Sequence, residues 1–225
     1  MSISTKKRIA VLISGRGSNL GALIDAAKDE HYPAEIVLVI SNRPGAKGLE
    51  IAQSAGIPTK VLDHRVFGKG QAAREAFDAA LASSLTETDI DFICLAGFMR
   101  LLTREFVSTF SNQIINIHPS LLPAFKGLNV HQRMLDAGVK IAGCTVHFVS
   151  ADMDSGPIIG QAALPVLADD TEATLAARTL KLEHQLYPAC LAAICSGRAV
   201  LDDNEIVRIE GNSAVRDDWL TSIKS

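Results

Sequence analysis

The chain carries the stretch RIAVLISGRGSN at residues 8–19, in which an apolar run leads directly into a glycine loop. A continuous apolar run of this length is typical of a parallel strand that is buried on both faces. After the loop, apolar residues recur with the spacing of an amphipathic helix, at Leu20, Leu23, Ile24 and Ala27. Strand, glycine loop and helix in this order form the first unit of a doubly wound α/β fold.

The same alternation continues along the chain and becomes less regular in its second half. In the first hundred residues, the further predicted strands are 35–40, 59–62 and 91–96, and the predicted helices are 45–55 and 73–85. Beyond them, the predicted strands are 113–117, 141–149 and 157–166, and the predicted helices are 127–137 and 171–195. Strands separated by helices favour right-handed crossovers and a parallel sheet. We expect Pro188 to kink the last helix or to end its first part near Tyr187.

These elements predict a single-domain, doubly wound α/β protein over residues 1–225. Its sheet should be mostly parallel, with an antiparallel edge where strands 141–149 and 157–166 pair across a short loop. We expect a Rossmann-like half over about residues 1–100 and a more specialised half over about 101–198. The tail, residues 199–225, is expected to form a small ribbon.

The net charge and the cysteine pattern argue against several classes of protein, among them nucleic-acid-binding and membrane-binding ones. Lys and Arg number 22 against 25 Asp and Glu, a net charge of −3, which gives no basic footprint for nucleic acid or an anionic membrane. No apolar run approaches the roughly 18 residues of a membrane span. The four cysteines show no CxxC pair and each lies in an apolar run. We therefore expect a cytoplasmic protein without nucleic-acid or membrane partners.

The glycine loop, residues 14–19, is suited to a phosphate group. Backbone N–H groups of Gly17, Ser18 and Asn19 can turn toward an anion at the start of a helix. A dinucleotide is not expected, because Leu20 stands where the GxGxxG pattern requires glycine, and no Gly-Lys-Ser/Thr follows for a Walker A loop. The alternative is a tight turn in which Ser18 or Asn19 caps the helix.

Polar side chains at the end of the strand 113–117 suggest catalysis. Asn116 and His118 are two residues apart, so they share one face of that strand. An amide and an imidazole can together stabilise an oxyanion and move a proton. Asp154, in a loop between two later strands, could stabilise a protonated His118. The alternative is that these side chains only satisfy turns; His147 is interpreted as a packed histidine, and no metal is expected because metal-ligand spacings are absent.

Four segments of the sequence carry a more specific signal. They are VLISGRGSNL at 11–20, LAGFMRLL at 95–102, NIHPSLLP at 116–123 and DSGP at 154–157. In this order they resemble the phosphoribosylglycinamide formyltransferase family of folate-dependent enzymes, over about residues 8–198. The resemblance implies the formyltransferase fold, and transfer of a formyl group from 10-formyltetrahydrofolate, as co-substrate, to the amine of glycinamide ribonucleotide.

The resemblance also implies roles for individual residues. The catalytic residues would be Asn116, His118 and Asp154. Glycinamide ribonucleotide would be bound by Gly17, Ser18, Asn19 and Glu183. The folate would be bound by Arg74, Met99, Arg100, Leu101, Leu102, Asn116, Ser150, Ala151, Asp152, Met153 and Asp154. Leu122-Pro123 becomes a candidate cis peptide bond. The first half would then hold the substrate phosphate, and the second half would hold the folate and catalyse the reaction.

Rival interpretations remain within and outside this family. Methionyl-tRNA formyltransferase shares the HPSLLP chemistry but carries an additional RNA-binding domain. Formyltetrahydrofolate hydrolase is another rival, but it carries an N-terminal regulatory domain. We do not identify either domain in this sequence. A protein of another class would bind a phosphate ligand on the same α/β sheet without catalysis. In each case the expected partners are small molecules, and the protein would be a monomer or a homodimer.

Overall fold

The computed structural model describes residues 6–210, 215–216 and 219–221. Its internal contacts divide the chain into two compact units, Met1–Ile115 and Asn116–Ser225. The boundary lies some fifteen residues after the one expected from the sequence, inside a strand. A single-domain organisation stays a prediction, and each unit is described by itself.

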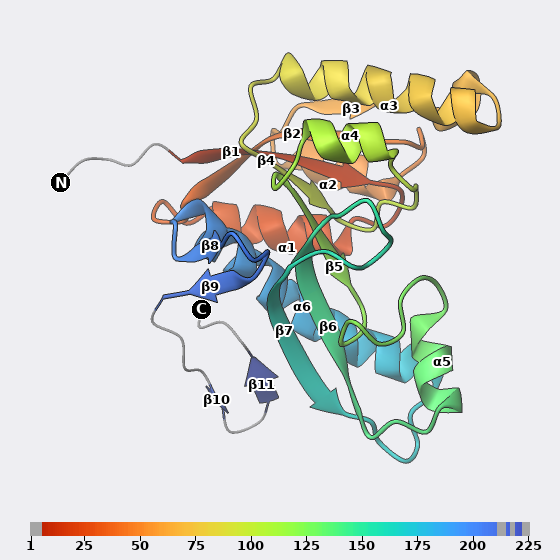
Figure 1. Cartoon of the computed structure of the whole chain (residues 1–225), viewed down its shortest axis with the longest axis vertical. Helices are drawn as coiled ribbons and strands as arrows, with labels where there is room; N and C mark the ends of the chain where they lie inside the picture. Colours follow the sequence, from red (N-terminus) through yellow and green to blue (C-terminus); the bar gives the residue numbers. More distant parts are fainter. Residues whose placement is uncertain (1–5, 211–214, 217–218, 222–225) are drawn as a thin grey trace. The chain divides into compact units, whose positions relative to one another are not determined.

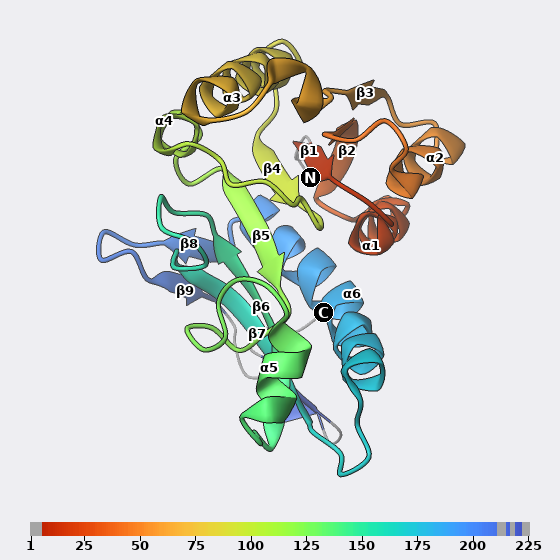
Figure 2. The same cartoon turned by 90° about the vertical axis from the view of Figure 1, so that its right-hand side faces the viewer.

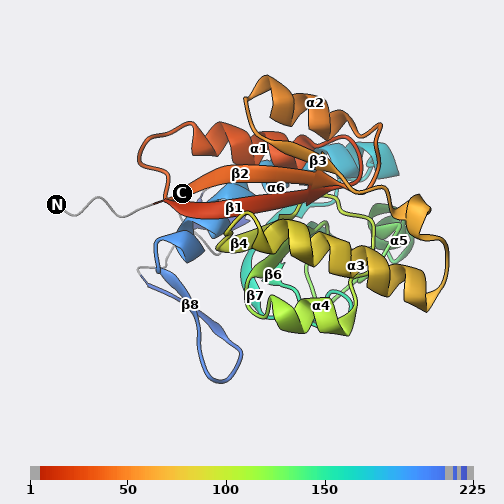
Figure 3. The ribbon, with the colours of Figure 1, turned by 90° about the horizontal axis from the view of Figure 1, so that it is seen from above.

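The first unit contains a parallel sheet in the order β4-β1-β2-β3. The strands are β1 (Lys7–Ile13), β2 (Ala34–Ser41), β3 (Thr59–Val61) and β4 (Phe92–Leu95), and the helices are α1 (Ser18–Ala27), α2 (Lys47–Ser54), α3 (Gln71–Thr86) and α4 (Arg104–Thr109). A short 3₁₀ helix, η1 (His64–Phe67), precedes α3. Figure 3 shows α1 and α2 on one face of this sheet and α3 on the other. This is the doubly wound arrangement that the alternating pattern predicted.

The burial of β1 explains its sequence. This strand lies between β2 and β4, and Ile9 to Ile13 are completely buried. Both faces of a central strand are covered by helices, so both must be apolar. The continuous apolar run was therefore read correctly as a buried parallel strand.

The second unit combines one long helix with a sheet in which β6, β7, β10 and β11 pair antiparallel. The strands are β5 (Ile114–His118), which crosses the boundary from the first unit, β6 (Ile141–Phe148), β7 (Ile158–Pro165), β10 (Val215–Arg216) and β11 (Trp219–Thr221), in the order β10-β11-β7-β6-β5. The helices are α5 (Val130–Asp136) and α6 (Glu172–Cys195). Strands β6 and β7 pair antiparallel, as expected. Figure 2 shows α6 running beside β6 and β7, on which it packs.

The tail begins with a small hairpin. Strands β8 (Ala199–Leu201) and β9 (Val207–Ile209) pair antiparallel as a separate sheet, visible beside α6 in Figure 1. This confirms the expected ribbon for the first part of the tail. The α/β fold class with an antiparallel edge is likewise confirmed.

Of the two alternatives expected at Pro188, the one that ends the helix was wrong. The helix does not end near Tyr187 but continues through Pro188 to Cys195. Proline removes one backbone hydrogen bond from a helix interior. Here the residues on both sides of Pro188 are buried, including Leu186 and Leu191, so the packing of the helix outweighs the loss of that bond.

Candidate active site

The catalytic residues predicted at the end of β5 lie in the second unit. Asn116 and His118 are separated by the buried Ile117 and occupy the same face of the strand. The His118 side chain is 7% exposed and the Asp154 side chain 12%. His118 Nδ1 lies 3.4 Å from Asp154 Oδ2, so the structure brings this pair together as the sequence suggested.

The loop after β5 holds both members of the pair. The carbonyl oxygen of Phe125 accepts a hydrogen bond of 3.0 Å from His118 Nε2, and the backbone N–H of Gly127 donates to Asp154 Oδ2 over 2.8 Å. Phe125 and Asp154 adopt left-handed backbone conformations, with φ of 54° and 48°. The peptide bond Leu122-Pro123 in this loop is cis, as the resemblance implied. These two hydrogen bonds hold the His118 and Asp154 side chains against the loop, and they hold the loop in place as well.

Both ring nitrogens of His118 therefore face acceptors. A carbonyl oxygen can only accept, so Nε2 carries a proton. Nδ1 faces the carboxylate oxygen Oδ2 of Asp154 at 3.4 Å. A substrate oxygen could accept a hydrogen bond from His118 only by replacing Phe125 or Asp154 as the acceptor.

His147 on β6 belongs to the same cluster, which the sequence did not reveal. Its Nδ1 lies 2.8 Å from the carbonyl oxygen of Phe148 and must carry the proton. Its Nε2 is then an acceptor, 3.2 Å from the amide nitrogen of Asn116. Burial lowers the pKa of His147, although Asp154 Oδ1 lies 4.0 Å away and opposes the shift. A neutral His147 thus orients the Asn116 amide, leaving its second N–H available to a ligand.

This contact could not be read from the sequence. Asn116 and His147 are 31 positions apart, and their approach depends on the pairing of β5 with β6. A histidine between Val146 and Phe148 in an apolar strand is equally consistent with simple packing. The packed interpretation of His147 was therefore incomplete, because the residue is both buried and bonded to a candidate catalytic side chain.

Glu183 and the loop 150–154 also lie in the second unit. Glu183 is 7% exposed on α6, and its charge together with burial raises the pKa of the Cys144 thiol, burial being the larger cause. In the loop, Ser150 Oγ donates to the carbonyl oxygen of Asp152 over 3.1 Å. Met153 is 50% exposed, which leaves an apolar side chain free to contact a ligand.

The glycine loop lies in the first unit and forms an open helix N-terminus. Gly17 is the N-cap of α1, with φ of 77°, and no side chain caps the helix. The alternative in which Ser18 or Asn19 caps α1 is therefore not observed. A Cβ at Gly17 would lie 2.5 Å from Gly48 Cα, so only glycine allows the loop to approach α2 this closely. Uncapped N–H groups at a helix start are suited to a phosphate.

A buried carboxylate that the sequence did not single out, Asp78, lies near two of the predicted folate residues of the first unit, Arg74 and Arg100. Asp78 on α3 accepts a hydrogen bond of 2.6 Å from the backbone N–H of Thr103, at the end of the segment 99–103. Arg100 lies over the ring of Phe77, 4.5 Å from its centroid. Burial raises the pKa of Asp78, while the charges of Arg100 and Arg74 oppose the shift. Asp78 therefore anchors the segment that carries Met99 to Leu102.

Met99 and Leu101 are exposed apolar side chains. Their exposed fractions are 62% and 52%. The backbone beneath them is fixed, because the N–H of Met99 donates to Ser14 Oγ over 2.7 Å. A segment that has a backbone fixed by hydrogen bonds and presents large apolar side chains to solvent is typical of a ligand-binding surface.

Comparison with known protein families identifies the class of protein to which this chain belongs. The formyl transferase model matches residues 7–191, and the chain therefore belongs to the formyl transferase family. Within this family it is 42% identical over 196 residues to the phosphoribosylglycinamide formyltransferase of Escherichia coli, covering 87% of this chain and 91% of the relative. The crystal structure of the phosphoribosylglycinamide formyltransferase from Anaplasma phagocytophilum superposes with a TM-score of 0.84 at 46% identity, covering 93% of this chain and 97% of that one.

A longer relative is also similar. The chain is 49% identical over 204 residues to the bovine trifunctional purine biosynthetic protein adenosine-3, which covers 90% of this chain but only 20% of the relative. The chain thus spans about a fifth of the length of that protein. These relatives confirm the family indicated by the four sequence motifs. Among the described residues, no helix is long and apolar enough to cross a membrane.

Proposed function

We propose that this chain transfers the formyl group of 10-formyltetrahydrofolate to the amine of glycinamide ribonucleotide. The products would be N-formylglycinamide ribonucleotide and tetrahydrofolate, in purine synthesis. The observation that carries the proposal is the cluster at the end of β5, where Asn116, His118 and Asp154 converge and His147 orients Asn116. The names and coverage of the bacterial relatives support the same reaction.

The chemistry follows from the charges that the reaction creates. The amine attacks the formyl carbon, and negative charge develops on the formyl oxygen. The free N–H of Asn116 and an N–H of protonated His118 would stabilise that oxygen. The amine must lose a proton, which a water molecule oriented by Asp154 could carry away. The bond between the formyl carbon and the folate nitrogen then breaks, and that nitrogen takes up a proton.

The two His118 acceptors acquire distinct roles in this scheme. The Asp154 carboxylate faces His118 Nδ1 and would stabilise positive charge on the imidazole in the transition state, so this contact must persist during the reaction. The hydrogen bond to Phe125 is between a charged donor and a neutral carbonyl, and it is the one that the formyl oxygen would replace. Substrate binding would therefore exchange one acceptor for another at His118 Nε2.

Binding of the two substrates is assigned to further residues. The uncapped start of α1 at Gly17, Ser18 and Asn19 would hold the ribonucleotide phosphate, and the carboxylate of Glu183 would contact the same substrate. The folate would be bound by the segments 99–102 and 150–154 and by Arg74. The folate serves as co-substrate, and no metal is required. We further propose a cytoplasmic, single-domain enzyme that acts on small molecules as a monomer or homodimer.

A direct assay tests this function. The purified chain is incubated with 10-formyltetrahydrofolate and glycinamide ribonucleotide, and the ribonucleotide is analysed by mass spectrometry. Formylated ribonucleotide should form with the wild-type chain and should be strongly reduced with His118→Ala. The proposal fails if the folded wild-type chain gives no formylated product at saturating substrates.

A further inference from the structure

A basic pocket lies in the first unit, lined in part by Ser14, Gly15 and Arg16 at the start of the glycine loop. A pocket of about 580 Å³ opens at the carboxyl ends of β1 and β2, between the loop and the start of α2. Its charged lining residues are Arg16, Arg43, Lys47 and Arg65, with His64 beside them. None of the residues that line it is acidic, and none belongs to the proposed phosphate loop Gly17–Asn19.

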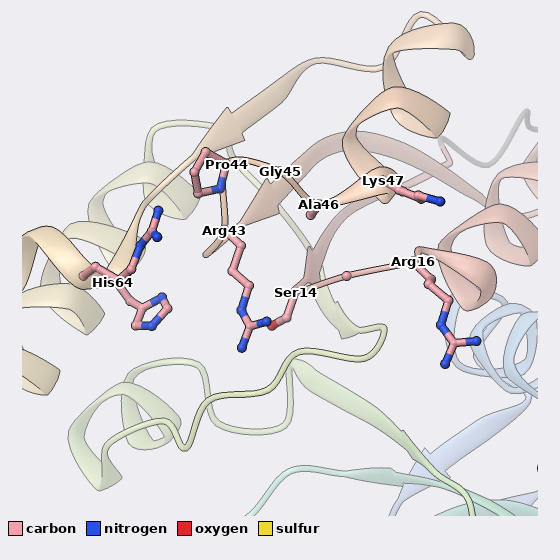
Figure 4. Close-up of a pocket in the computed structure, with 10 residues that line it drawn as sticks. Ser14, Arg16, Arg43, Pro44, Gly45, Ala46, Lys47 and His64 are labelled. Atoms are coloured by element: carbon pink, nitrogen blue, oxygen red, sulfur yellow. The ribbon is translucent and has the colours of Figure 1, made fainter.

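Three of these cations are not neutralised by the described part of the chain. Arg65 is paired with Asp63 over 2.7 Å. By contrast, the side chains of Arg16, Arg43 and Lys47 form no hydrogen bond or ion pair with any residue that the structure describes. Figure 4 shows Arg16 and Arg43 extending on the same side of the loop, with the ring of His64 turned toward Arg43. Three unpaired cations around one concave surface attract anions, although the chain as a whole carries a net charge of −3.

The backbone of the pocket adds to this field. Helix α2 begins at Lys47, and its N-cap, Ala46, provides no side-chain cap. The partial positive charge of this helix start therefore faces the same region as the unpaired cations. The helix start and the unpaired cations therefore both add positive electrostatic potential to the pocket.

The walls of the pocket are held in place before any ligand binds. The N–H of Gly48 donates to the carbonyl oxygen of Gly15 over 3.0 Å, which ties α2 to the loop. On the other wall, Ser14 Oγ donates to the buried Asn42 Oδ1 over 2.6 Å, and His64 Nδ1 lies 2.8 Å from the Asn42 carbonyl oxygen. A site with fixed walls loses little conformational freedom when it binds.

We propose that this pocket binds an anionic ligand carrying two or more phosphate or carboxylate groups. One phosphomonoester carries a charge of only about −1.5 to −2 at neutral pH, whereas three unpaired cations surround the pocket. Two sources of such a ligand exist, namely a polyphosphate chain, as on a nucleotide, and a chain of γ-linked glutamates, as on a folate. The second source rests on the proposed function, and the first does not.

Calorimetric titration of the whole chain tests the proposal with two probes, inorganic tripolyphosphate and γ-linked triglutamate. The variant Arg43→Glu/Lys47→Glu reverses two charges of the pocket on exposed side chains. The control, Lys140→Glu/Arg198→Glu, makes the same change of net charge in the second unit, on two other exposed side chains. Wild type and control should bind at least one probe, more weakly at high salt because these charges are screened.

The pocket variant should bind that probe about tenfold more weakly or worse, as expected for losing contacts to charged groups. Tighter binding of tripolyphosphate would identify a phosphate ligand, and tighter binding of triglutamate would identify the folate chain. The proposal is overturned if neither probe binds at millimolar concentration, or if the control weakens binding as much as the pocket variant. Because these titrations require no catalysis, their failure is distinct from failure of the proposed formyl transfer.

Discussion

Replacing Asp154 by asparagine removes one charge from the candidate catalytic cluster while keeping its shape. Asp154 Oδ2 accepts the N–H of Gly127 over 2.8 Å, and an asparagine oxygen can still accept this bond. The side chain is only 12% exposed, so a substitution of equal size should leave its surroundings in place. The variant therefore isolates the effect of the carboxylate charge on His118.

The size of that effect can be worked out from the distance. Two unit charges 3.4 Å apart interact by about 5 kcal/mol at an effective dielectric constant of about 20. Desolvation of the buried pair consumes part of this, and a remainder of about 2.7 kcal/mol corresponds to a factor of about 100 in rate. We expect kcat of Asp154→Asn to fall on the order of 100-fold, with little change in KM for either substrate, because the interaction strengthens in the transition state.

Steady-state kinetics with both substrates varied provides the measurement. Asp136→Asn, which removes the same charge from an exposed position on α5, serves as the control and should retain wild-type rates. The double variant Asp154→Asn/His118→Ala should be little slower than the slower single variant, since residues that act as a unit are not additive. Strictly additive losses, or a large rise in KM with kcat intact, would refute the reasoning.

Three further predictions follow from particular contacts. His147→Phe should lower kcat about tenfold with little change in KM, because Asn116 loses the acceptor that orients its amide. His147→Gln retains an acceptor and should recover part of the rate. Equal losses of kcat in both variants would argue against a role of His147 in positioning Asn116. Gly17→Val should cost about 1–3 kcal/mol of unfolding free energy, since its Cβ would meet Gly48, and should raise KM for the ribonucleotide far more than for the folate. Cys144, whose pKa is raised by burial, should resist iodoacetamide until the chain is unfolded, and rapid labelling of the native chain would contradict its buried position.

Much of the fold could be predicted because the apolar pattern of most segments agrees with their position in the folded chain. β1 is apolar throughout because it is a central strand, and the spacing of Leu20, Leu23 and Ile24 places the buried face of α1 correctly. Asn116 and His118 could be placed together because strand residues two apart share a face. Where packing overrode the local rule, one predicted alternative failed: α6 does not end near Tyr187 but continues through Pro188 to Cys195.

The remaining features of the candidate site depend on contacts between distant segments. The contact between His147 and Asn116 requires the register of neighbouring strands, and the anchoring of residues 99–103 by Asp78 requires α3 to pack against that segment. Neither register nor packing leaves a local pattern in the sequence. Asp154 could be named as a candidate from its place in a loop, but only the family resemblance assigned it to the cluster, because no spacing rule joins it to His118 across 36 positions of chain.

The fate of the formyl group tests the central claim most directly. The wild-type chain is given 10-formyltetrahydrofolate with an isotopically labelled formyl carbon, together with glycinamide ribonucleotide, and the products are examined by nuclear magnetic resonance. The proposed transferase should place the label on the amine nitrogen of the ribonucleotide in step with release of tetrahydrofolate. Label that appears only as free formate, or that stays on the folate, would contradict the assignment of this cluster to formyl transfer.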